Sequence, residues 1–208
     1  MIIGKTKIYK WWKNTVAKSL KKKRLDRILR LAKIPTDKKI NVLEIGCGNG
    51  KDVVQFLNDG DKYEVWGLDI LEQQIEQDNF TFIKGDAASL PFEDKSFDLV
   101  ISVGLLEHIE EIETLCKITK EIDRVSDAFV VVVPCLSTFV ESHNMGIRWP
   151  MRLHKNYTTK NIKTPLKLNF YSDHTWTKFP GFFDADVERC YYIPPLIKNT
   201  IIYKSNKS

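Results

Sequence analysis

Long hydrophobic runs are missing from this sequence of 208 residues. The longest, Ala128–Val133, suits a buried strand and is far shorter than the roughly 18 apolar residues that span a bilayer. The residues after Met1 contain neither an apolar signal core nor a small-residue cleavage site. We therefore expect a cytoplasmic, globular protein without a transmembrane segment.

Cysteine and histidine are scarce, with four of each. The cysteines include no CxxC pair, and the histidines form neither HxH nor HExxH, so the spacings typical of disulfide frameworks and zinc sites are absent. These residues are Cys47, Cys116, Cys135, Cys190, His108, His143, His154 and His174. We expect reduced, mostly packed thiols and no metal site.

Acidic residues are nearly absent from the start of the chain. Residues 1–39 hold two acidic and fourteen basic residues, a net charge of +12, whereas residues 40–208 hold 25 acidic and 18 basic residues, a net charge of −7. Apolar residues recur every four positions at Ile8, Trp12, Val16 and Leu20. A second helical pattern follows and stops at Pro35. The sequence thus predicts a basic helical arm or lid over residues 1–39, attached to one domain over residues 40–208.

Strand and helix patterns alternate through most of that domain. Strands are predicted over residues 41–45, 63–69, 80–86, 97–103 and 128–134, and helices over residues 51–58, 71–77 and 109–125. A short helix over 173–179 precedes two further strands, 183–193 and 199–204. This order predicts an α/β, doubly wound, Rossmann-like sheet of seven mostly parallel strands that ends in an antiparallel hairpin. Residues 135–171 form an irregular insertion.

The stretch VLEIGCGNG, residues 42–50, places a glycine turn directly after a strand. The dinucleotide fingerprint GxGxxG, started at Gly46, would need Gly or Ala where Lys51 stands, and no phosphate-loop GKS or GKT follows. Gly48 and Gly50 allow the backbone to lie directly against a ligand. Because the acidic Glu44 precedes the turn, we expect a ligand with positive charge rather than a phosphate.

Two further carboxylates follow neighbouring strands. Asp69 lies nineteen residues after Gly50, at the end of the second predicted strand, where it can accept hydrogen bonds from both hydroxyls of a ribose. Asp86 ends the third strand. Together with Glu44, they fit a cationic nucleoside ligand.

These motifs resemble those of class I S-adenosylmethionine-dependent methyltransferases, in the UbiE/UbiG-like (methyltransferase type 11) group. The matching stretches are VLEIGCGNG, GLD, GDAASLPFEDKSFDLVISVGLLEHI and FPGFFDADVE. The resemblance is close over residues 40–134 and looser over residues 174–204. It implies a methyltransferase that uses S-adenosyl-L-methionine and releases S-adenosyl-L-homocysteine, with transfer to an O, N or C nucleophile of a small-molecule acceptor.

The resemblance also implies roles for individual residues. The methionine portion of the cofactor is expected against Glu44, Gly46, Cys47, Gly48, Asn49 and Gly50. The ribose is expected at Asp69, and the adenine against Ile70, Asp86 and Ala87, with Asp86 accepting from its amine. The methionine amine and the methyl-transfer pocket are expected beside Ser102, Val103 and Gly104.

Methyl transfer requires alignment of the nucleophile, and a general base where the acceptor must lose a proton. His108 is the first candidate for that base, and a packed helix-start histidine is the alternative. His143, His154 and His174 are weaker candidates. The insertion offers an acceptor pocket for an anionic or aromatic substrate, or else a solvated loop, at Arg148, Trp149, Arg152 and Tyr157.

Several alternatives stay open at this point. The basic arm suits a lid over the cofactor pocket, an anionic membrane surface or nucleic-acid phosphates. Methylation of DNA base amines is disfavoured, because SVGLLEH stands where an N/D/S-P-P-Y/F/W motif would be. RNA or protein acceptors, a non-catalytic cofactor-binding module, and aminopropyl transfer with Glu107 as a polyamine ligand remain as further alternatives.

Overall fold

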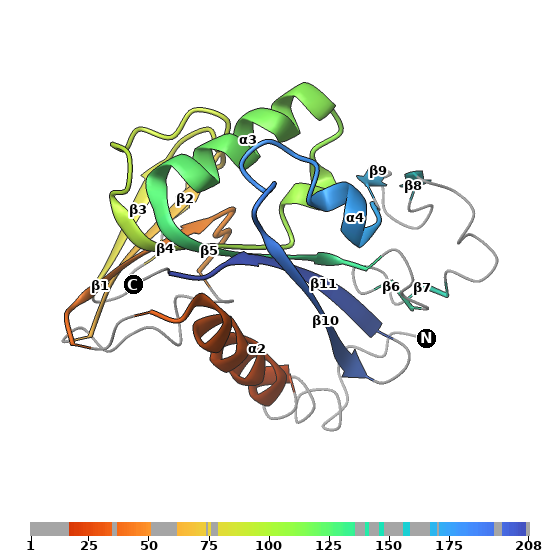
Figure 1. The fold of residues 1–208 in the computed structure, drawn as a ribbon, viewed down its shortest axis with the longest axis horizontal. Helices are drawn as coiled ribbons and strands as arrows, with labels where there is room; N and C mark the ends of the chain where they lie inside the picture. Colours follow the sequence, from red (N-terminus) through yellow and green to blue (C-terminus); the bar gives the residue numbers. More distant parts are fainter. Residues whose placement is uncertain are drawn as a thin grey trace.

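The computed structural model describes residues 17–34, 37–50, 62–73, 75, 79–135, 140–141, 146–147, 156–158, 167–169, 171–193 and 197–206. Its centre is a seven-stranded sheet with the order β10-β11-β5-β4-β1-β2-β3 (Figure 1). The strands are β1 (Ile40–Ile45), β2 (Tyr63–Asp69), β3 (Phe80–Lys84), β4 (Phe97–Val103), β5 (Ser126–Pro134), β10 (Asp186–Ile193) and β11 (Ile197–Lys204).

The strand order reverses between β1 and β4. From β1 the chain adds β2 and β3 on one side and then β4 and β5 on the other, and all these neighbours are parallel. Strand β11 is antiparallel to β5, and β10 is antiparallel to β11 at the sheet edge. The predicted doubly wound sheet with its C-terminal hairpin is thus confirmed. In sheets of this kind, ligands bind beyond the carboxyl ends of the two strands at which the order reverses, here β1 and β4.

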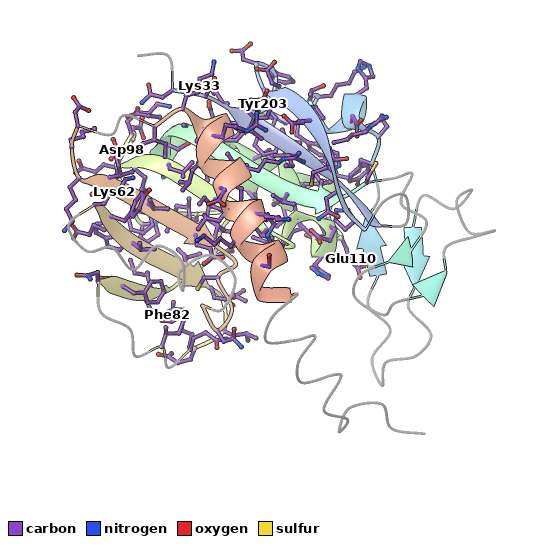
Figure 2. The ribbon with its side chains drawn as sticks, turned by 90° about the horizontal axis from the view of Figure 1, so that it is seen from below. Lys33, Lys62, Phe82, Asp98, Glu110 and Tyr203 are labelled. Carbon is purple, nitrogen blue, oxygen red and sulfur yellow. The ribbon has the colours of Figure 1, made fainter. Side chains whose placement is uncertain are left out.

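Helices cover both faces of the sheet. Helix α3 (Ile112–Val125) and the short α4 (Asp173–Trp176) lie on one face, and α2 (Ala17–Ala32) lies on the other (Figure 1). Viewed from the α2 side, α2 crosses the strands, with Lys33 and Tyr203 near its carboxyl end (Figure 2). Most described apolar side chains of α2 and α3 are buried against the sheet in two core clusters, and Ile112 at the start of α3 is exposed. The sheet edges and turns, rather than its faces, are therefore the places where a ligand can approach.

Most predicted elements match the structure closely. Strands β2 and β4 coincide with the predicted strands 63–69 and 97–103, and α2 contains the second helical pattern of the arm. Helix α3 begins at Ile112 rather than at residue 109, because residues 106–108 form a separate 3-10 helix, η4 (Leu106–His108). The predicted helices over 51–58 and in the first part of the arm lie outside the described residues.

The predicted helix over residues 71–77 is wrong in its described part. Leu71, Glu72, Gln73 and Ile75 have no helical structure. The Asp69 carboxylate accepts a hydrogen bond of 3.0 Å from the Leu71 N–H, two residues along the chain. Such local side-chain acceptors compete with helix formation and turn the backbone instead.

The insertion over residues 135–171 is less irregular than expected. Its described residues form two short antiparallel pairs, β6 (Val140–Glu141) with β7 (Gly146–Ile147), and β8 (Asn156–Thr158) with β9 (Lys167–Asn169). Strand β9 lies against η4. The β8–β9 pair therefore reaches the end of the sheet at which β4 stops.

Among the described residues, none of the helices has the length and apolarity that a membrane crossing requires.

Candidate functional site

The glycine turn leaves the carboxyl end of β1 at the switch point. The N–H groups of Gly46 and Cys47 donate to the carbonyl of Leu68 on β2, at 2.8 and 3.2 Å. Gly46, Gly48 and Gly50 all have positive φ angles, of 71°, 50° and 68°. This left-handed backbone is one that glycine adopts without the strain of a Cβ. The three glycines thus turn the chain sharply across the end of the neighbouring strand.

Asp69 joins that turn to the end of β2. One carboxylate oxygen accepts from the Gly48 N–H at 2.9 Å, and the other accepts from the Leu71 N–H at 3.0 Å. A Cβ placed on Gly48 would meet no atom of the described chain within 4 Å. The backbone of Gly48 therefore faces open space directly beside a carboxylate, as a close-fitting nucleoside requires.

The next strand end carries a second exposed carboxylate. Asp86 follows β3, and its side chain accepts from the Ala88 N–H at 2.8 Å, while its carbonyl accepts from the Ser89 N–H at 3.0 Å. Near Asp69, the apolar side chain of Ile70 is 67% exposed. An exposed apolar side chain directly after Asp69 suits contact with the face of a flat base.

The end of β4 completes the site. Ser102 is fully buried, and within the described part of the chain its Oγ has no hydrogen-bond partner. Val103 ends the strand, and Gly104 follows with φ 74°, its N–H donating to the carbonyl of Val132 at 3.0 Å. Leu105 then packs against Gly46, with its Cβ 3.0 Å from the position that a Gly46 Cβ would occupy. The ends of β1 and β4 are thus in direct contact.

Several acidic residues gather in this region. Glu44 and Glu107 are almost completely buried at 2% and 1% exposure, and a Glu107 oxygen lies 3.6 Å from the position of a Cβ on Gly104. With Asp69 and Asp86, four acidic residues thus lie at or just beyond the carboxyl ends of β1 to β4.

Cys47 is a neutral thiol in this setting. Burial, together with the charges of Glu44 and Asp69, raises its pKa to about 12. A protonated thiol is a poor nucleophile, so Cys47 contributes shape to the turn rather than reactivity.

A comparison with known proteins identifies the site. Residues 43–128, from β1 into β5, match the family described as "Methyltransferase domain". Residues 43–128 are therefore a methyltransferase domain, within a chain that has the fold of class I S-adenosylmethionine-dependent methyltransferases. The buried strand, the glycine turn, Asp69 and Asp86 all lie inside the matched residues, and the open space beside Gly48 fits the cofactor of this family.

Curated relatives of this methyltransferase domain include enzymes from a plant and a bacterium. Ajmaline N-methyltransferase of Rauvolfia serpentina is 29% identical over 125 residues, which cover 52% of this chain and 41% of the relative. The 27-O-demethylrifamycin SV methyltransferase of Amycolatopsis mediterranei is 33% identical over 81 residues, which cover 34% of this chain and 29% of the relative. The chain thus matches less than half the length of these relatives.

Solved structures agree with the fold. The 1,6-didemethyltoxoflavin-N1-methyltransferase of Burkholderia thailandensis, solved with S-adenosylhomocysteine, superposes with a TM-score of 0.62 at 12% identity. The superposition covers 91% of this chain and 80% of that protein. At this identity the agreement shows the methyltransferase fold alone.

The structure brings the predicted cofactor residues of the methyltransferase together. All thirteen lie at or just after the carboxyl ends of β1, β2, β3 and β4, and they are Glu44, Gly46, Cys47, Gly48, Asn49, Gly50, Asp69, Ile70, Asp86, Ala87, Ser102, Val103 and Gly104. Their individual contacts with the cofactor stay predictions. What the structure adds is the carboxylate of Asp69 already hydrogen-bonded to the turn.

The predicted acceptor residues are less completely placed. His108 ends η4, is half-buried, and donates its N–H to the carbonyl of Leu105 at 2.9 Å. Tyr157 belongs to β8, whose partner β9 lies against η4. Arg148, Trp149 and Arg152 lie outside the described residues, as do His143 and His154. His174 lies in α4 and is exposed.

Sequence reasoning did not single out one pair near the site, Glu121 and Arg124 of α3. Both side chains bind the backbone of the segment that follows Asp86. Their spacing of three residues was the available signal, but such pairs are common on exposed helix faces and by themselves indicate no site.

Proposed function

We propose that this chain transfers the methyl group of S-adenosylmethionine to an O, N or C nucleophile of a small-molecule acceptor. The observation that carries the proposal is the 2.9 Å hydrogen bond from Gly48 to Asp69 at the sheet's switch point, beside open space. Both curated relatives described above are named for small acceptors, one methylated on nitrogen and one on oxygen. Neither name points to a nucleic acid or a membrane.

The cofactor residues divide by the part of the ligand that each faces. Asp69 accepts from the ribose hydroxyls, Ile70 covers one face of the adenine, and Asp86 accepts from the adenine amine. The glycine turn and the end of β4 enclose the methionine portion. When bound, S-adenosylmethionine supplies an electrophilic methyl group on a sulfonium centre. The buried carboxylates Glu44 and Glu107 complement that positive charge.

The acceptor lies beyond Gly104, beside η4 and the β8–β9 pair. His108 is the residue of this region that can remove a proton from a hydroxyl or ammonium acceptor, since its unperturbed pKa lies near neutrality. A site that excludes water and holds the acceptor in line with the methyl group makes the main contribution that a protein offers to this displacement.

Calorimetric titration of S-adenosylmethionine and S-adenosylhomocysteine tests the proposal directly. We expect roughly micromolar dissociation constants for the wild-type chain. Asp69→Ala should weaken both by about tenfold or more, because it removes hydrogen bonds to a charged acceptor. The exposed Asp184 offers a matched control, and Asp184→Ala should bind like the wild type.

The outcomes separate the alternatives. Failure of the wild type to bind either ligand overturns the proposal. Binding without release of S-adenosylhomocysteine in any pool of small acceptors, RNA or protein would instead support a non-catalytic binding module. Product release with RNA or protein alone would replace the acceptor class and keep the cofactor.

A further inference from the structure

The segment between β3 and β4, residues 85–96, contains Asp86, which we propose binds the adenine, and α3 forms hydrogen bonds to the same segment. Two hydrogen bonds close a tight turn from Asp86 to Ser89. The next residue, Leu90, donates its N–H to Glu121 at 2.8 Å and accepts at its carbonyl from Arg124 at 3.2 Å. Both partners lie in the last turns of α3, which runs beside this segment (Figure 1).

Arg124 uses its full capacity to donate. Its five N–H groups match five acceptors, which is the complete set that a guanidinium offers. These are the two carboxylate oxygens of Glu121 at 2.7 and 2.8 Å, the carbonyl of Phe92 and the carboxylate of Asp94 at 2.8 Å each, and the carbonyl of Leu90. One side chain therefore ties three points of the segment to the helix.

The rest of the segment is packed against the core. The side chain of Leu90 is 5% exposed, and the ring of Phe92 meets that of Phe97 edge to face at 4.8 Å between centroids. Within the described residues, the exposed part of this segment nearest the cofactor is the turn at Asp86, and its backbone continues directly into the clamped Leu90. The position of Asp86 thus depends on the contacts of Leu90.

We propose that the Arg124–Glu121 pair positions the adenine-binding turn, and that it sets both the affinity for the cofactor and its selectivity for adenine. The proposal rests on the function proposed above. Arg124 and Glu121 are positioning residues, because they touch the turn's continuation and not the ligand. Loss of the Arg124 hydrogen bonds to Glu121 and Leu90 would let Asp86 move by a few tenths of an ångström, enough to lengthen a hydrogen bond to the base.

A second ion pair on α3 supplies the control. The ammonium of Lys204 on β11 lies 2.7 Å from the carboxylate of Asp123. This pair is partly buried, as the Arg124–Glu121 pair is, and it connects α3 to β11 rather than to the segment after β3. Removing this contact should affect folding stability but not the Asp86 turn. A purely structural role for Arg124 would make the two pairs equivalent.

The experiment compares three variants with the wild type. Arg124→Lys keeps the charge and loses the planar fork, Glu121→Gln keeps the shape and weakens the pair, and Lys204→Gln is the control. Each is titrated calorimetrically with S-adenosylhomocysteine and with its inosine analogue, in which a carbonyl replaces the adenine amine. Thermal unfolding of each variant is recorded in parallel.

We expect Arg124→Lys and Glu121→Gln to raise the dissociation constant for S-adenosylhomocysteine by about 3- to 30-fold. The preference for adenine over the inosine analogue should fall toward one, while Lys204→Gln keeps both values of the wild type. The proposal would be overturned if both variants keep the wild-type affinity and the wild-type preference for adenine and only their unfolding temperature falls. If Arg124→Lys folds poorly, the milder Glu121→Gln decides the question alone. If the wild-type chain does not bind S-adenosylhomocysteine, the function proposed above is wrong, and the proposal for Arg124 and Glu121 falls with it.

Discussion

At the scale of single residues, the glycines of the turn serve different purposes although their backbone angles are alike. A Cβ on Gly46 would lie 3.0 Å from the Cβ of Leu105, so this glycine permits contact between the ends of β1 and β4. A Cβ on Gly48 would meet nothing within 4 Å of the described chain, so this glycine keeps space free for a ligand. Packing therefore explains the glycine at position 46, whereas for Gly48 we predict a role in binding.

Alanine at these two positions should therefore separate stability from binding. We expect Gly48→Ala to lower the free energy of unfolding by about 1 kcal/mol through its left-handed backbone alone. Gly46→Ala should lower it by about 1–3 kcal/mol more, because Leu105 must also shift. Cofactor affinity, by contrast, should fall further in Gly48→Ala. Urea denaturation and calorimetric titration give the two quantities, and wild-type affinity in Gly48→Ala would show that the open space is not the cofactor's.

At the scale of elements, α2 is a part of the core rather than a detachable arm. Its side chains at Leu25, Ile28 and Ala32 are buried in the cluster under β1, β4 and β5. In addition, Arg27 and Arg30 of α2 form ion pairs with Glu188 of β10 in the same sheet, at 3.4 and 3.5 Å. Because the apolar stripe of α2 is already covered by the sheet, α2 cannot place that stripe in a membrane while the fold is intact.

Truncation in the buried face of α2 should destabilise the whole domain. Ile28 is fully buried, and we expect Ile28→Ala to lower the free energy of unfolding by about 2–5 kcal/mol. The exposed Lys23 provides the control, since Lys23→Ala should change this quantity by no more than about 0.5 kcal/mol. Urea denaturation followed by circular dichroism measures both. Equal effects of the two changes would mean that α2 is not docked as the structure shows.

Elements were predictable where one local rule decided them. Strand β2 matches its predicted bounds because its apolar residues follow the turn-forming sequence NDGD and end at Asp69. The helix predicted at 71–77 is wrong because the residue types there are typical of a helix, but the Asp69 carboxylate accepts a hydrogen bond from the Leu71 N–H and turns the chain. That hydrogen bond depends on the position of Asp69 beside the glycine turn, which a local pattern does not contain.

At the scale of the whole molecule, the sheet's reversal between β1 and β4 gathers the predicted cofactor residues from four strand ends. Those residues span positions 44 to 104 of the chain. Only the parallel order of the strands brings them to one edge. A ligand bound there contacts several elements at once, so its binding free energy stabilises the folded state as a unit.

The cofactor should therefore raise the unfolding temperature of the entire chain. At a concentration about 100 times its dissociation constant, S-adenosylmethionine should add about 2.7 kcal/mol to the free energy of unfolding. For a domain of this size we expect a shift of roughly 5–11 °C. Differential scanning calorimetry measures the shift, and Asp69→Ala at the same concentration should show a much smaller one. An unshifted wild-type transition would contradict binding to the folded state.

The sequence by itself determined the strand and helix alternation, the glycine turn, the acidic residues at the strand ends and the family to which they belong. These are local features, set by periodicity and by the steric demands of single residues. The tertiary structure decided that Asp69 binds the turn, that α2 is buried beneath the sheet, and that Arg124 and Glu121 hold the segment behind Asp86. The physical reason is distance along the chain: Leu90 and Arg124 lie 34 residues apart, and only packing of the helix against the sheet makes them neighbours.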